Sequence, residues 1–124
     1  MDKLPLIWAA TALAAVFAMP GCDSPGGNLY QRLQHEDPSV RIEAMRQAAE
    51  AKDMAAAPYI VEQLNDSDAD VRMFAIISLE KITGRRLGYQ HYAPAAQRDE
   101  AIERWRQWLR EHASTTQPVP DGQQ

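Results

Sequence analysis

Few side chains in this sequence are of the types that do chemistry. They are a single cysteine, Cys22, and three histidines, His35, His91 and His112. A catalytic histidine needs a nucleophile or a second base nearby, and a metal site needs further ligands at matching spacing. The sequence has no cysteine pair, no His-Glu-x-x-His string and no glycine-rich phosphate loop. We therefore predict a protein that is not an enzyme, with no catalytic residue, no metal and no cofactor.

Length and charge narrow the class of protein further. The chain has 124 residues, which is enough for one domain. Its 13 basic and 17 acidic side chains give a net charge of -4, so nucleic acid phosphates and anionic membrane surfaces are not attracted over long range. A nucleic-acid partner is not expected.

The first 21 residues have the pattern of a secretory signal peptide. Lys3 precedes an apolar run from Leu4 to Met19, which ends at Pro20 and Gly21. This run is shorter than the about 20 apolar residues of a transmembrane helix. We expect residues 1–21 to direct export and then to be removed.

The segment Met19-Pro20-Gly21-Cys22 resembles the lipobox of bacterial lipoproteins, in which cleavage between Gly21 and Cys22 would leave the cysteine as a lipid-carrying N-terminus. Pro20 departs from the family pattern, which has a small residue there. The resemblance implies that Cys22 bears a diacylglycerol and an acyl chain, and such multiple chains hold a protein stably on a membrane. The alternative is an incidental thiol, but an exported protein with one cysteine has no partner for an internal disulfide.

Two segments are expected to lack regular structure. Residues 22–28 form a short linker, whose Pro25 and paired glycines disfavour helix and strand. The six residues 23–28 reach roughly 20 Å, so the domain must lie close to the membrane. Residues 114–124 have no apolar periodicity and are expected to be a disordered tail.

Residues 29–84 contain an internal repeat. Identical residues recur at a spacing of 31 positions, at Leu33 and Leu64, Asp37 and Asp68, Val40 and Val71, Arg41 and Arg72, and Ala44 and Ala75. Each unit is predicted to be two helices joined by a turn, with an aspartate capping the second helix. The last of these helices, over Val71 to Ile82, is apolar nearly all round and should be the centre of the domain.

A further helix is predicted over residues 95–113, after a connecting loop at 85–94. Its apolar side carries Trp105 and Trp108. We expect both rings to pack against the central helix and to close the stack, because two units alone are fewer than the three that a repeat array usually needs.

The segments DPSVRIEAMRQAA and DADVRMFAIISLEKITG resemble HEAT repeats, in the short bacterial variety related to phycobilisome lyase repeats. The resemblance implies an all-α fold of two HEAT-like α-hairpin units, capped by the C-terminal amphipathic helix. It also implies that Asp37 with Arg41, and Asp68 with Arg72, bond across neighbouring turns. These four residues would be structural.

Candidate partner-binding residues lie on the helix surfaces and in the connecting loop. They are Arg46, Gln47, Glu50, Phe74, Ser78, Lys81, Tyr89 and Tyr92. Phe74 is either an exposed anchor or is covered by Trp105 or Trp108, and we favour burial. Tyr89 and Tyr92 either form a recognition edge or pack over the core, and we favour packing.

The sequence thus predicts an exported, lipid-anchored HEAT-like module that binds another protein of the bacterial cell envelope, on the periplasmic or outer face of a membrane. One alternative is a bilin-lyase-like enzyme that holds a tetrapyrrole near Tyr89, His91 and Tyr92. Another is an accessory subunit of a larger envelope assembly. The sequence does not identify the partner.

Overall fold

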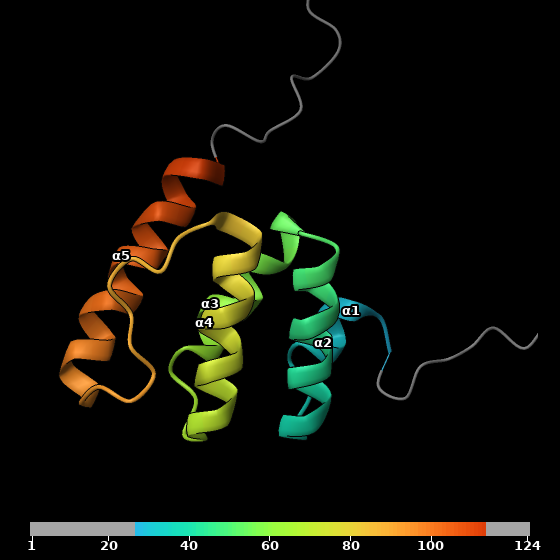
Figure 1. Cartoon of the computed structure of the whole chain (residues 1–124). Coiled ribbons are helices and arrows are strands. Elements are labelled where there is room, and N and C mark those ends of the chain that lie inside the picture. Colours follow the sequence, from blue (N-terminus) through green and yellow to red (C-terminus); the bar gives the residue numbers. More distant parts are fainter. Residues whose placement is uncertain (1–26, 114–124) are drawn as a thin grey trace, which may run out of the picture.

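The computed structural model describes residues 27–113, and every regular element in this range is a helix (Figure 1). The elements are α1 (Leu29–Arg32), α2 (Pro38–Glu50), the 3-10 helix η1 (Met54–Ala56), α3 (Ala57–Gln63), α4 (Ala69–Thr83) and α5 (Ala95–Ala113). The predicted all-α fold class is confirmed. The signal peptide, Gly21, Cys22 and most of the linker lie outside the described residues, as does the tail at 114–124.

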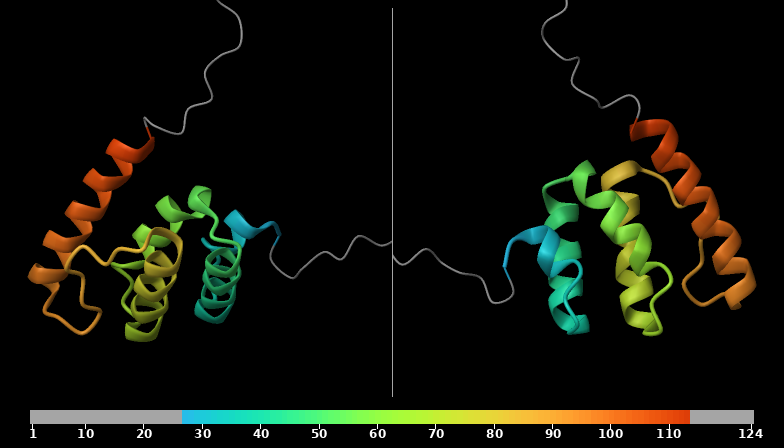
Figure 2. Two further views of the ribbon diagram at one scale, coloured as in Figure 1. Left: turned by 45° about the horizontal axis from the view of Figure 1, so that its top comes forward. Right: turned by 180° about the vertical axis from the view of Figure 1, so that it is seen from behind.

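Two helical hairpins stand side by side. Helices α2 and α4 run in the same direction and pack along each other, while α1 and α3 lie behind them (Figures 1 and 2). Among the helices of residues 27–113, none combines the length and apolar composition needed to cross a bilayer.

Local capping explains where the long helices begin and end. Asp37 accepts a hydrogen bond from the Ser39 backbone N–H at 2.8 Å, and Asp68 accepts one from the Asp70 N–H at 2.8 Å, so both predicted caps are present. At its other end α4 stops at Gly84, whose φ of 74° is left-handed and favours glycine.

The core lies between the two hairpins and is built mainly from aliphatic side chains. Its fully buried members include Met45, Ile60, Leu64, Val71, Ile76 and Leu79. As predicted, α4 packs against more than one neighbour, because α2 and α3 both cover it. One strip of α4 remains open to solvent, and Ile77 on this strip is 37% exposed.

Helix α5 does not pack as the sequence predicted. It lies chiefly against α3, and the connecting loop runs beside α4, where it accepts a hydrogen bond from Arg72 and forms an ion pair with Glu80. Both tryptophans still contribute to the shared core, because Trp105 is in the same buried cluster as the α4 side chains and Trp108 packs against that cluster. Trp105 is fully buried and donates its indole N–H to the Arg86 carbonyl at 3.2 Å, whereas Trp108 is half-buried.

Helix α5 also carries the pattern of the two earlier second helices. It runs in the same direction as α2 and α4 (Figure 1). Its Arg98 corresponds to Arg41 of α2 and Arg72 of α4, because each of these arginines is the fourth residue of its helix. In each helix, three residues that are at most 2% exposed follow the arginine at the same spacing. They are Ala44, Met45 and Ala48 in α2, Ala75, Ile76 and Leu79 in α4, and Ala101, Ile102 and Trp105 in α5. We therefore interpret the loop and α5 as a third unit, in which α5 lies against α3, in the layer of the first helices, and the loop lies beside α4.

The burial of Trp105 leads to a stability prediction. Replacing it with alanine should lower the free energy of unfolding by about 3 to 5 kcal/mol, because a large ring leaves the core and a cavity remains. Urea unfolding of the wild type and of Trp105→Ala would measure the difference. Tyr92→Ala is the control, since Tyr92 is 72% exposed and its loss should change stability by less than about 0.5 kcal/mol. Equal effects of the two substitutions would contradict the role given to Trp105.

Candidate functional site

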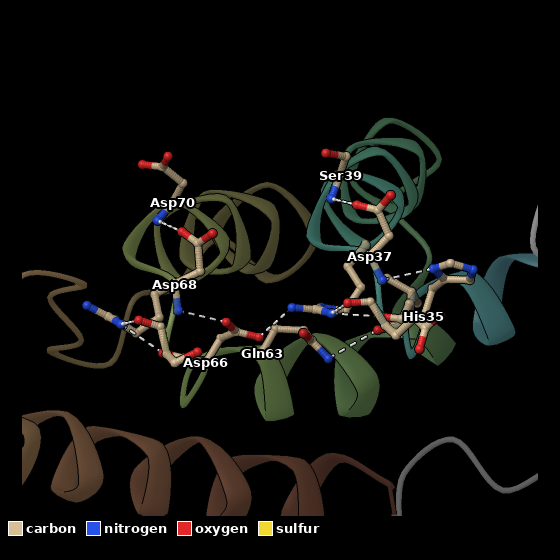
Figure 3. A network of polar contacts seen from close by, with 12 residues as sticks. His35, Asp37, Ser39, Gln63, Asp66, Asp68 and Asp70 are labelled. Carbon is tan, nitrogen blue, oxygen red and sulfur yellow. Dashed lines mark hydrogen bonds and ion pairs between the residues drawn. The ribbon is translucent and has the colours of Figure 1, made fainter.

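An arginine in each second helix binds the turn that precedes that helix. Arg41 donates to the carbonyls of His35 at 2.6 Å and Glu36 at 3.0 Å. Arg72 donates in the same way to Asp66 at 2.7 Å and Ser67 at 3.0 Å, as Figure 3 shows for both turns. In the third unit Arg98 donates to the Ala93 carbonyl at 2.6 Å.

The same arginines connect neighbouring units. Arg41 forms an ion pair of 2.7 Å with the Asp66 carboxylate of the next turn, and the two side chains are only 12% and 16% exposed. Arg72 donates to the His91 carbonyl of the connecting loop at 3.1 Å. These two contacts hold the turns of the three units in register.

The family resemblance implied that Asp37 pairs with Arg41 and Asp68 with Arg72, and these pairings are wrong. Asp37 and Asp68 accept from backbone N–H groups of their own helices, while the arginines reach back to the turn carbonyls. Because each capping carboxylate bonds to the start of its own helix, the guanidinium binds the turn carbonyls instead. The acidic partner of Arg41 is Asp66, which the sequence analysis missed because the residue 31 positions earlier is His35 and not an acid.

A polar hollow of about 430 Å³ lies between the first two turns. Gln63 spans it and donates its side-chain amide to the Leu33 carbonyl at 3.1 Å (Figure 3). The other lining residues are Gln34, His35, Glu36, Arg41, Glu62, Asn65 and Asp66. Within residues 27–113 no group of histidine, cysteine or acidic side chains is arranged to hold a metal ion. The hollow is therefore lined by hydrogen-bonding groups.

A second surface follows the outward sides of α2 and α4, and we call it the helix ridge. It consists of Arg46, Glu50, Phe74, Ile77 and Lys81. Gln47 is also exposed, but it accepts a hydrogen bond from Arg32 of α1 at 2.5 Å and so lies toward α1. Phe74 is half-buried against the core, between the two alternatives considered from the sequence. Ser78, expected on this surface, is only 3% exposed, since it faces into the packed domain. Ile77 was missed because its counterpart in the first unit is the charged Arg46.

The α2 part of the ridge is balanced in charge. Arg46 forms ion pairs with Glu43, at 2.6 Å, and with Glu50. The hydrogen bond from Arg46 lowers the pKa of Glu43, and Glu43 in turn raises the pKa of Arg46. The α4 part instead presents apolar surface at Phe74 and Ile77.

The connecting loop separates its two tyrosines. Tyr89 is 1% exposed and donates its hydroxyl to the Leu64 carbonyl at 2.6 Å, and burial raises its pKa. Tyr89 therefore packs over the core. Tyr92 is 72% exposed and lies edge-on to His91, with ring centres 5.1 Å apart. A tetrapyrrole on the loop surface would meet His91 and Tyr92 but not Tyr89.

Comparison with known families supports the repeat interpretation. A family model described as HEAT repeats matches residues 28–104. The match extends into α5 and so includes Arg98 and Ile102 of the third unit. Comparisons with curated proteins and with solved structures gave no significant match.

The Arg41–Asp66 contact can be tested with a double-mutant cycle. The coupling free energy between Arg41→Ala and Asp66→Ala should be about 1 to 3 kcal/mol, because both charges are mostly removed from solvent. The control is Arg46 with Glu50, an exposed pair for which about 0.3 to 0.5 kcal/mol is expected. Urea unfolding of the four variants in each cycle gives both values. A coupling no larger than that of the control would show that Asp66 does not hold the units together.

The buried hydroxyl of Tyr89 predicts a dependence on alkaline pH. At neutral pH, Tyr89→Phe should cost about 1 kcal/mol, because the Leu64 carbonyl loses a donor. The folded pKa of Tyr89 is raised above 10.0, so its contribution is present below pH 10.0 and declines as the pH rises through the folded pKa. The difference in unfolding free energy between wild type and Tyr89→Phe should therefore narrow above pH 10.0. Tyr92→Phe is the control and should follow the wild type, and a gap that widens would contradict the prediction.

Proposed function

The chain belongs to the HEAT-repeat family, and we propose that it is a non-catalytic interaction module held on a bacterial envelope membrane through Cys22. HEAT repeats generally mediate protein–protein interaction or scaffolding. In this proposal the stack binds one envelope protein and carries out no reaction itself.

The observation that carries the proposal is the composition of the helix ridge. Phe74 and Ile77 supply apolar surface on α4, and Arg46, Glu50 and Lys81 add charged groups on the same side of the two helices. Protein interfaces commonly have such an apolar core with a polar rim. Ile77 takes the place of a salt-bridged arginine in the preceding unit, so its apolar exposure is specific to α4.

Membrane attachment is supported by the lipobox resemblance at Met19 to Cys22. The first described helix begins at Leu29, only a few residues after Cys22. A lipid on Cys22 would keep the ridge within reach of partners that are themselves in or on the membrane.

The anchor can be tested separately from the partner. In a bacterial host that expresses the full chain, an alkyne-bearing fatty acid should label the wild type, which should fractionate with membranes. Cys22→Ser should lose both the label and the membrane fraction. An unlabelled wild type in the soluble fraction would remove the anchor from the proposal.

The partner surface can be tested with a photo-crosslinking amino acid at Ile77 in intact cells. We expect a defined crosslinked product, which weakens strongly when Cys22→Ser releases the protein from the membrane. The same amino acid at Glu100, exposed on α5, is the control position. After purification the captured protein should bind the full chain, and Ile77→Asp should weaken that binding about tenfold, or ~1.4 kcal/mol. Equal crosslinking at both positions, or unchanged binding by Ile77→Asp, would exclude the ridge as the interface.

A further inference from the structure

An aromatic and apolar patch lies where α1 meets η1 and α3. Tyr30 of α1 and Tyr59 of α3 have ring centres 5.4 Å apart, and both are half-buried. Met54, at the start of η1, is 42% exposed and is among the most exposed large apolar side chains of residues 27–113. Ala55 and Pro58, both exposed, continue this stretch without charge. We call Tyr30, Met54 and Tyr59 the tyrosine patch.

The patch is held in place by a polar contact at its margin. The Tyr30 hydroxyl donates to the Asp53 carboxylate at 3.0 Å, and Asp53 also caps η1 by accepting from the Ala55 N–H at 3.0 Å. The hydrogen bond to Asp53 raises the pKa of Tyr30, so its ring stays neutral. Both tyrosines are half-buried, so each leaves part of its side chain at the surface.

The patch is also next to the point where the described chain begins. Tyr30 is the second residue of α1, three residues after Gly27. Cys22 precedes Gly27 by five residues, which span at most about 17 Å when fully extended. A lipid anchor on Cys22 would therefore keep the start of α1, and the patch beside it, close to the bilayer.

We propose that the tyrosine patch rests in the headgroup region of the membrane that carries the lipid anchor. This inference depends on the proposed acylation of Cys22. Tyrosine is favoured at membrane interfaces because its ring is apolar while its hydroxyl remains hydrated. Met54 adds an unbranched apolar side chain that can enter the boundary between headgroups and acyl chains.

The chemistry of the patch favours uncharged headgroups. The chain carries a net charge of -4, so an anionic surface offers no long-range attraction. The contact would depend on ring and methionine surface leaving water, so zwitterionic phosphatidylcholine is the appropriate probe.

The test uses the full, acylated chain in phosphatidylcholine vesicles, some of whose lipids carry a nitroxide on the headgroup. A fluorophore is attached to the new cysteine of Met54→Cys and, in a matched protein, of Ser67→Cys. Because acylation blocks the Cys22 thiol, only the introduced cysteine is labelled. Ser67 is an exposed residue in the turn before α4, at the far end of helices that are about 20 Å long. Quenching by the nitroxide should be several times stronger at position 54 than at position 67.

Each outcome has a separate meaning. Vesicle flotation of both labelled proteins reports the anchor, and quenching reports the orientation. Flotation with equal quenching at the two positions would overturn the tyrosine-patch inference and leave the anchor intact. Failure of both proteins to float would remove the anchor and, with it, this inference.

Discussion

The stack depends on one arginine in each second helix. A turn that leads into a helix leaves carbonyl groups without partners, and in this protein Arg41, Arg72 and Arg98 donate to them. A guanidinium has five donors in a planar fork, so one side chain can bind its own turn and still reach the next unit. Arg41 reaches Asp66 and Arg72 reaches the His91 carbonyl. Lysine, with one compact charged group, lacks this geometry.

The third unit shows how the same plan tolerates the loss of a helix. The unit has a loop beside α4 in place of one helix, and Tyr89 of this loop is buried in the core. Its hydroxyl also satisfies the Leu64 carbonyl at the end of α3. The larger side chain of Trp105, at the place of Ala48 and Leu79, supplies further bulk. Helix α5 is therefore able to lie against α3.

Interactions between residues close in sequence predicted much of this fold. Contacts between residues of different units could not be predicted in this way. Aspartate caps, the period of the apolar residues and Gly84 depend on neighbouring residues, so they could be inferred from the sequence. The partner of Arg41 and the burial of Ser78 depend on how two units meet, which one sequence does not specify. A fixed spacing of 31 also concealed the third unit, because Arg98 follows Arg72 after only 26 positions. At the candidate interface, the exposure of Arg46 and Glu50 could be predicted, whereas that of Ile77 depends on which side of α4 its neighbours leave uncovered.

The closed third unit sets a limit on polymerisation. Repeat proteins expose the faces of their terminal units, and copies that join head to tail through such faces can grow into open filaments. Here α5 and the loop cover the final hairpin, and Trp105 is wholly inside. Further copies cannot add to that hairpin by continuing its helical layers, so any self-assembly has to use a different surface and cannot be simple elongation of the solenoid.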